Sequence, residues 1–235
     1  AMPRLVQIPF PDSEKVVHIA CGIDHTLALT ERGAVFSWGV GSFGNLGHGT
    51  TDDQDIPREI TFFSTRPCNM VAAGTKHSMA LTRKRIVYSW GHGGHGRLGQ
   101  GPGKDASLFP REINASSKAG MVYIAAGEAH SASIDEMDNV YCWGAGSYGR
   151  TGHGEESDVP MAKMLQTLCD TPSKQVALGT VHSLSLSIKG EVWAWGSGYA
   201  TGLVKSGGID IIRTPNRMHF QSDESEGTLN VVQIS

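Results

Sequence analysis

Cysteine is scarce in this sequence, and the few cysteines do not group. The 235 residues include four, and no two have the Cys-x-x-Cys spacing of a zinc site or a redox pair. A disulfide framework would need a denser and more regular set. We therefore expect free thiols, no structural metal and a reducing compartment, either the nucleus or the cytoplasm.

Long apolar runs and an excess of one charge are also missing. No stretch approaches the roughly 20 apolar residues of a membrane-spanning helix, and the start lacks the charged-then-apolar pattern of a signal peptide. Basic residues number 20 and acidic residues 23, so the net charge is −3. Neither a membrane partner nor a direct nucleic-acid site is indicated.

What the chain does contain is a repeat of about 52 residues with two anchors. Successive copies of each anchor are 52, 53 and 52 residues apart, and a shared period identifies a true repeat. The first anchor is a Gly-x-x-His motif at Gly22 and His25, Gly74 and His77, Gly127 and His130, and Gly179 and His182. The second is a Trp-Gly pair at Trp38 and Gly39, Trp90 and Gly91, Trp143 and Gly144, and Trp195 and Gly196. We expect the residues of both anchors to be structural.

Each copy has four short stretches with strand character and no helical period of comparable length. In the first copy we expect strands over Val16–Ala20, Thr26–Thr30, Val35–Trp38 and Ile56–Phe62. Four antiparallel strands per tandem repeat are typical of β-propeller blades. The sequence therefore predicts an all-β propeller of four-stranded blades, with one domain over 1–235 and repeats at about 16–62, 70–115, 122–165 and 175–220.

The two ends of the chain carry partial repeats. Residues 3–8 match the strand that finishes a repeat, and residues 231–235 match the strand that begins one. A segment of a longer ring has this pattern, and so does a ring closed by strands from both ends. An incomplete ring would leave strand edges and an apolar blade face exposed, which favours self-association.

Two cysteines occupy repeat positions that hold small residues in other copies. Cys21 corresponds to Ala73, and Cys142 corresponds to Ser37. We expect both to be small core residues.

The combined motif resembles one known repeat. Three motifs follow one another in a repeat, most clearly in the first two copies: Gly-x-x-His-(Ser/Thr)-x-(Ala/Ser)-(Leu/Ile), Val-(Phe/Tyr/Trp)-x-Trp-Gly-x-Gly and Gly-x-Leu-Gly-x-Gly. This pattern closely resembles the repeat of the regulator of chromosome condensation family. The resemblance covers nearly the whole chain in four copies and implies a β-propeller, which has seven blades in the family's best-known members.

The resemblance implies two functions of different kinds. One is a non-catalytic interaction propeller that acts as a scaffold or regulatory domain. The other is guanine-nucleotide exchange on a Ran-like small GTPase with chromatin association, as in the family's founding member. That member carries a projecting β-wedge after a Trp-Gly pair, and here only the irregular stretch Tyr199–Gly208 could take its place.

A third branch of the family contains the plant UV-B photoreceptor, which clusters tryptophans beside the repeat histidine. The residues between Gly and His here are Ile-Asp, Thr-Lys, Glu-Ala and Thr-Val, so we do not expect photoreception.

The recurring glycines and histidines invite chemical interpretations that do not hold. The run from Gly39 to Gly44 matches a dinucleotide fingerprint as a string, but no helix or βαβ unit follows it. Histidines at one repeat position lie around a ring, too far apart to share a metal ion. We expect each ring to be hydrogen-bonded to a neighbouring turn, and we expect no catalytic residues and no cofactor.

Acidic loops follow the glycine runs of the first and third copies at equivalent points. We expect them on one face of the propeller, where a basic protein partner could dock by electrostatic steering. The alternative is that they only keep the surface soluble. The candidate partner-binding residues are Asp52, Asp53, Asp55, Glu155, Glu156, Asp158 and Tyr199.

Overall fold

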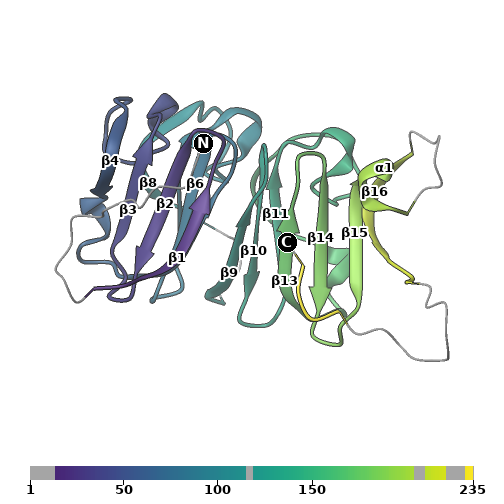
Figure 1. Cartoon of the computed structure of the whole chain (residues 1–235). Helices are drawn as coiled ribbons and strands as arrows, with labels where there is room; N and C mark the ends of the chain where they lie inside the picture. Colours follow the sequence, from purple (N-terminus) through teal and green to yellow (C-terminus); the bar gives the residue numbers. More distant parts are fainter. Residues whose placement is uncertain (1–13, 115–118, 204–209, 221–230, 235) are drawn as a thin grey trace, which may run out of the picture.

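The described residues include sixteen strands in four separate antiparallel sheets, which we call blades 1 to 4. The computed structural model describes residues 14–114, 119–203, 210–220 and 231–234. In every blade the strands pair in chain order, each with the next, and Figure 1 shows the blades side by side. Blade 1 contains β1 (Val16–Cys21), β2 (His25–Thr30), β3 (Val35–Gly39) and β4 (Gln54–Glu59).

The other three blades repeat this plan. Blade 2 contains β5 (Cys68–Ala73), β6 (His77–Thr82), β7 (Val87–His92) and β8 (Ala106–Glu112). Blade 3 contains β9 (Met121–Ala126), β10 (His130–Asp135), β11 (Val140–Gly144) and β12 (Val159–Met164). Blade 4 contains β13 (Ser173–Leu178), β14 (His182–Ser187), β15 (Val192–Ser197) and β16 (Ile211–Arg217). The first strands of successive blades contact one another, so β1, β5, β9 and β13 line the inner side of the array.

The helical pieces are short and lie in connections. One α-helix, α1 (Gly198–Thr201), follows β15. The 3-10 turns η1 (Ser42–Gly44), η3 (Gly94–Gly96) and η4 (Ser147–Gly149) follow the Trp-Gly pairs of blades 1 to 3. The expected all-β class with four-stranded antiparallel blades is confirmed.

All four strands of blade 1 differ from their expected bounds, by one residue in the first three strands and by more in the last. The outer strand of blade 1 was expected to run to Phe62, but β4 ends at Glu59 and η2 (Thr61–Phe63) follows it. The turn places Phe63 in the core with 1% of its surface exposed. Blade 3 repeats this arrangement with η5 (Gln166–Leu168), whose last residue is equally buried. The apolar residues after the strand therefore form a turn whose last side chain packs into the core.

The glycine of each Trp-Gly pair is required by a close approach. Gly144 lies opposite His130 in the register of β11 and β10, and its φ is 108°. A Cβ atom there would lie 2.6 Å from the carbonyl oxygen of Ala129. Side chains rarely adopt this conformation, and only glycine lets the backbone pass this close. The equivalent glycines lie opposite their own repeat histidines with the same left-handed φ: 105° at Gly39, 99° at Gly91 and 114° at Gly196.

Beyond the contact with their own histidines, these glycines have different surroundings. Besides the histidine of its own blade, Gly91 approaches a residue of blade 1, because a Cβ there would lie 3.1 Å from Asn45 Cα. At Gly196 the nearest atoms belong to its own blade, and a Cβ would lie 2.4 Å from Val181 O. The glycine is thus needed within every blade, and at Gly91 it also lets blade 1 approach.

The hydrophobic core lies between blades. One cluster joins the Leu27 and Phe63 side of blade 1 to the Tyr88 and Trp90 side of blade 2. Equivalent clusters join blades 2 and 3, and blades 3 and 4, each with one fully buried indole, Trp143 or Trp195. Each blade therefore completes its core with its neighbour, as stacked repeat units do.

The outer side of blade 1 has no equivalent neighbour among the described residues. Ile19 is 63% exposed, Trp38 is partly exposed and Cys21 is exposed. The expectation that Cys21 is a core residue is wrong, because its repeat position faces a preceding blade. Cys142 faces blade 4 and is fully buried, as expected, and burial raises the pKa of its thiol to about 12.

Residues 231–234 lie against blade 4 where a fifth blade would begin. The Val231 amide donates to Gly190 O, as the Ser173 amide that begins β13 donates to Asp138 O. The Gln175 side chain exchanges hydrogen bonds with the Ile234 backbone, and Figure 1 places the C-terminal mark beside β13. The match of this segment to the start of a repeat thus has a spatial counterpart. Residues 3–8, matched to the end of a repeat, lie outside the described residues.

The difference between Trp143 and Trp38 gives a stability prediction. Replacing Trp143 with alanine removes an indole that is 1% exposed from the joint between blades 2 and 3. We expect a loss of about 3–5 kcal/mol in the free energy of unfolding, measured by urea denaturation. Trp38→Ala is the matched control, because its indole faces the open side of blade 1. Equal losses at the two positions would contradict the assignment of the core to the joints.

Candidate functional site

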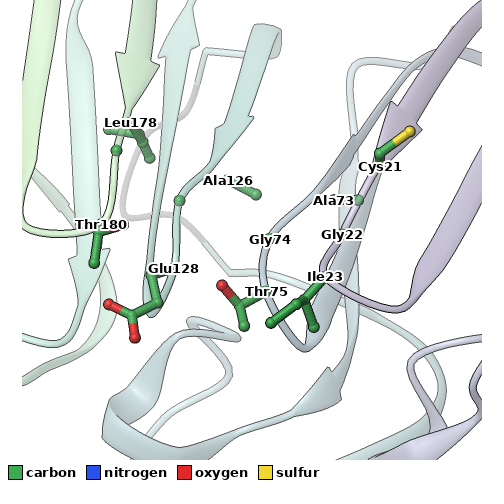
Figure 2. Close-up of a pocket in the computed structure, with 12 residues that line it drawn as sticks. Cys21, Gly22, Ile23, Ala73, Gly74, Thr75, Ala126, Glu128, Leu178 and Thr180 are labelled. Carbon is green, nitrogen blue, oxygen red and sulfur yellow. The ribbon is translucent and has the colours of Figure 1, made fainter.

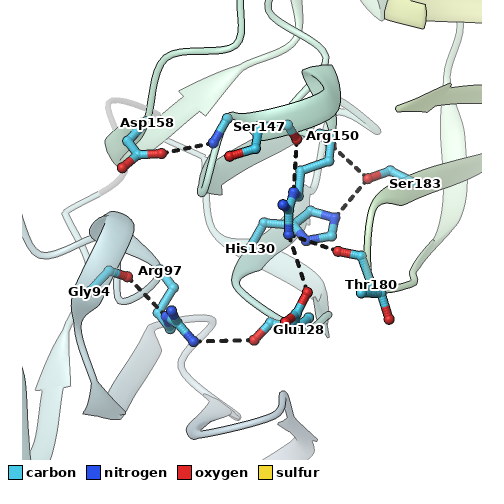
Figure 3. Close-up of polar contacts among 10 residues, drawn as sticks. Gly94, Arg97, Glu128, His130, Ser147, Arg150, Asp158, Thr180 and Ser183 are labelled. Carbon is cyan, nitrogen blue, oxygen red and sulfur yellow. Dashed lines mark hydrogen bonds and ion pairs between the residues drawn. The ribbon is translucent and has the colours of Figure 1, made fainter. Parts of the chain in front are cut away.

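The repeat histidine and the hydroxyl residue after it connect neighbouring blades. His130 Nε2 lies 2.8 Å from Ser183 Oγ, and that hydroxyl donates to Arg150 O at 2.7 Å (Figure 3). Trp195 Nε1 donates to the same carbonyl at 2.8 Å. Ser183 and Trp195 are directly opposite on β14 and β15, so their side chains share a face and reach one acceptor.

The same joint occurs between the other blades. In the joint between blades 2 and 3, His77 bonds to Ser131, and Ser131 and Trp143 both donate to Arg97 O. Between blades 1 and 2, His25 bonds to Ser78, and Ser78 and Trp90 both donate to Asn45 O. The expected hydrogen bond of the histidine is present, but its partner is a strand residue of the next blade and not a neighbouring turn.

The geometry fixes the protonation of these rings. A serine hydroxyl has one proton, and here it goes to the carbonyl, so the histidine Nε2 must carry a proton and donate it. Nδ1 of His25, His77 and His130 is buried without a hydrogen-bond partner among the described residues, as expected for neutral rings. Burial lowers the pKa of His130 to about 3 and that of His25 to about 4, and it lowers the pKa of His77 well below 6.5.

The last histidine of the series differs. His182 is partly exposed, and its ring makes no hydrogen bond to the described residues. Burial lowers its pKa from the ordinary value. In the other joints the hydroxyl partner belongs to the following blade, and no blade follows blade 4 among the described residues.

Two arginines form a second set of connections near the joints. Arg97 and Arg150 are each 6% exposed. Arg97 donates to Gly94 O within its own turn and to Glu128 O of blade 3 (Figure 3). Arg150 donates to Thr180 O of blade 4, and its Nη1 lies 3.5 Å from the Glu128 carboxylate. Each guanidinium therefore ties its own loop to the first turn of the next blade. At the equivalent position, the side-chain oxygen of Asn45 is buried and has no hydrogen-bond partner in the part of the chain that the structure describes.

The six acidic candidates all emerge at one end of the blades. We call this the loop end; it comprises residues 22–24 and 40–55 of blade 1 and their equivalents. Asp53 is used locally, because its carboxylate accepts the Gly41 amide at 2.8 Å. Asp52 and Asp55 are exposed, and no side-chain partner is found for them among the described residues.

The candidates in the third copy are mostly engaged. Asp158 accepts the Gly146 amide at 3.0 Å and pairs with His95 Nδ1 at 2.9 Å. Glu156 pairs with Arg213 of blade 4 at 2.6 Å, and Glu155 accepts the hydroxyl of Ser157. The structure thus brings the two acidic loops to the same end of the blades, and four of the six carboxylates bond to turns or neighbouring side chains.

Tyr199 stands apart from the carboxylates on α1 and is 84% exposed. Gly202 ends this helix in the left-handed conformation, with a φ of 69°. The remainder of the stretch expected to substitute for a wedge, residues 204–208, lies outside the described residues.

The glycines of the Gly-x-x-His motif line a shallow pocket on the inner side. Figure 2 shows it between the first turns of all four blades. The pocket has a volume of about 350 Å³. Backbone bonds tie these turns together, from the Ile23 amide to Thr75 O and from the Thr75 amide to Gly127 O. A Cβ on Gly127 would lie 2.6 Å from Gly179 O, so the motif glycine allows the blades to converge. Gly22 and Gly74 make the equivalent approaches to the blades that follow them.

The structure gives no support for metal chemistry in its described part. No group of three or more histidine, cysteine or carboxylate residues there could hold an ion. Likewise, none of the described helices is long and apolar enough to cross a membrane.

Sequence reasoning missed a row of strained aromatic residues at the loop end. Phe43, His95 and Tyr148 each lie five residues after the repeat tryptophan and have φ values of 60°, 60° and 62°. A non-glycine residue in this left-handed region costs roughly 1–2 kcal/mol. The recurrence of a ring at one repeat position was visible in the sequence, but its backbone conformation was not.

Comparison with known proteins identifies the repeat. A family model described as the RCC1-like domain matches residues 1–234. The ultraviolet-B receptor UVR8 of Arabidopsis thaliana is 34% identical over 195 residues, which are 83% of this chain and 44% of the receptor. The human E3 ubiquitin-protein ligase HERC2 is 36% identical over 184 residues, 77% of this chain and 4% of the ligase.

A solved structure agrees with the sequence comparison. Prp20p of Saccharomyces cerevisiae, described with its binding properties to Gsp1p and histones, superposes with a TM-score of 0.77 and 27% identity. The match covers 91% of this chain and 52% of Prp20p. The chain therefore spans about half the length of Prp20p and less than half that of the receptor.

The neutral buried histidines predict acid sensitivity. Their pKa values are lower in the folded chain than the ordinary 6.5, so the unfolded chain binds more protons below that pH. Stability should be full above pH 6.5 and should fall as the pH drops towards 4, by on the order of 1.4 kcal/mol per pH unit for each such ring.

Urea denaturation of the wild type and of His130→Asn between pH 7.5 and 4 measures this slope. The variant should be less stable at pH 7.5 but lose less on acidification. Parallel slopes would show that His130 is not the titrating group.

Proposed function

Because the chain belongs to the RCC1-like domain family, we propose that it is a non-catalytic interaction β-propeller that acts as a scaffold or regulatory domain. One observation carries the proposal: the polar side chains that recur in every repeat hold the blades together. The joint serines and histidines bond to each other and to loop carbonyls, which leaves them unsuited to act as nucleophiles or bases. Variation between blades is concentrated in the exposed loops, where a partner would be selected.

The partner we propose is a protein with a basic surface or tail that docks at the loop end. Asp52, Asp55 and Glu155 are exposed there, and Tyr199 adds an exposed ring. Electrostatic complementarity of this kind mainly raises the association rate and the specificity. The description of Prp20p with histones supports a chromatin protein as one such partner. We propose the nucleus or the cytoplasm as its location, because the free cysteines of the described residues suit a reducing compartment.

The alternative is guanine-nucleotide exchange on a small GTPase. It is favoured by the likeness to Prp20p, which is described with its binding to Gsp1p, and by the irregular segment that follows Trp195 and carries Tyr199. Exchange requires no covalent chemistry, because a protein that binds the empty GTPase more tightly must weaken nucleotide binding by the same factor.

Nucleotide release separates the two functions. The purified chain is added in stoichiometric amount to small GTPases loaded with a fluorescent guanine nucleotide, Ran among them. We expect release at the intrinsic rate with every member of the panel. Accelerated release that Tyr199→Ala abolishes would overturn the scaffold proposal in favour of exchange.

Charge neutralisation tests the docking surface. The triple variant Asp52→Asn, Asp55→Asn and Glu155→Gln should bind purified histones about three- to tenfold more weakly at low salt, because three exposed attractions are lost. Folding should be unaffected, since these side chains are exposed. The matched control neutralises Glu31 and Asp170 at the opposite end of the blades. Equal binding by wild type and the triple variant would place any basic partner elsewhere.

A further inference from the structure

The aromatic row at the loop end lies outside the hydrogen-bonded joints, although the Phe43 ring also packs on His92 of blade 2 with ring centroids 4.3 Å apart. Phe43 and Tyr148 are 41% and 45% exposed, and the side chain of His95 between them is 57% exposed. Each occupies the same position of its turn, one blade after another, in a backbone region that glycine adopts freely. Large apolar rings held at an exposed and strained position suggest a binding role.

The rings already accept cations from the chain itself. The Lys76 ammonium lies 5.5 Å from the centre of the Phe43 ring, and the Arg150 guanidinium lies 5.8 Å from that of Tyr148. Both distances suit a cation–π interaction. Because much of each ring remains exposed, a second cation can approach from solvent.

The charge around the row suits a cationic ligand. Asp24, Asp52, Asp55 and Glu155 are exposed at the loop end, against the exposed lysines 76 and 104. Glu156 and Asp158 also lie there, although Arg213 and His95 engage them. Carboxylates near aromatic rings favour lysine and arginine side chains and disfavour the phosphates of a nucleic acid.

We propose that Phe43 and Tyr148, with the carboxylates of Asp52, Asp55 and Glu155, form a docking surface for an extended, lysine- or arginine-rich segment of a partner protein. The segment crosses blades 1 to 3, with its cationic side chains over the two rings and its remaining positive charge near the carboxylates. His95 lies between the rings and keeps Asp158 paired. This inference rests on the proposed interaction function and deepens it, since it names the aromatic rings as the elements that recognise the cationic side chains.

The test uses a fluorescein-labelled peptide of twelve residues in which lysine and arginine alternate with serine. Its affinity for the whole chain is measured by fluorescence anisotropy at two salt concentrations. The matched peptide replaces lysine with norleucine and arginine with citrulline, which keep the stems and remove the charges. We expect the charged peptide to bind and the neutral one to bind at least about tenfold more weakly.

Two double variants test the rings. Phe43→Gly with Tyr148→Gly should weaken binding of the charged peptide about tenfold, while the urea midpoint stays the same or rises because glycine relieves the backbone strain. Phe43→Leu with Tyr148→Leu keeps apolar bulk without an aromatic face and should weaken binding similarly. Met137→Ala, which removes an exposed apolar side chain at the opposite end of blade 3, is the control and should change nothing.

The outcomes separate this inference from the proposed function. If both double variants bind as the wild type does while neutralising Asp52, Asp55 and Glu155 weakens binding, the aromatic inference fails and the scaffold proposal stands. If neither change weakens binding, basic-partner docking at the loop end fails as well. A lower urea midpoint in the glycine variant would show that the rings support the turns, and it would overturn the inference.

Discussion

Every blade joint depends on one carbonyl oxygen that accepts two hydrogen bonds from the next blade. Asn45, Arg97 and Arg150 supply this oxygen, and the serine and the indole opposite each other on the next blade donate to it. The serine can give its proton to the carbonyl only because the histidine of the preceding blade donates to the serine oxygen. The joint is therefore a directed chain of donors in which each histidine carries a proton on Nε2. Burial keeps these rings neutral, and apolar packing surrounds the indole.

This joint explains why the sequence predicts the architecture so well. Glycine, histidine and tryptophan recur at fixed spacing because each is constrained by a close contact, within its blade or with the next, and such constraints repeat with the blades. The sequence also contained a signal for the partner of the histidine. Ser78, Ser131 and Ser183 directly follow the repeat histidines of their own blades. The sequence shows that the histidine recurs with the repeat, but it does not show which blade the side chain faces. For this reason we expected its hydrogen-bond partner to be a neighbouring turn and not the serine of the next blade.

The errors have the same origin. Cys21 looked like a core residue because its equivalents pack against a preceding blade, which blade 1 does not have among the described residues. The acidic loops could be placed on one face because they begin at equivalent repeat positions. The hydrogen bonds from the turn amides to Asp53 and Asp158 depend on the turn geometry, which the sequence does not show. The left-handed conformation of Phe43 and Tyr148 was invisible, because their residue types do not favour it.

The division of each joint between two blades has a consequence for how such chains can grow. Each blade carries the histidine and the carbonyl on one side and the hydroxyl and the indole on the other. A tandem duplication of the gene segment for one blade therefore creates a complete new joint, and no compensating substitution is needed. Residues 231–234, bonded to blade 4 as the start of a further blade would be, occupy the point at which such an added unit attaches. Gain and loss of whole blades should therefore be tolerated more readily than insertions within a blade.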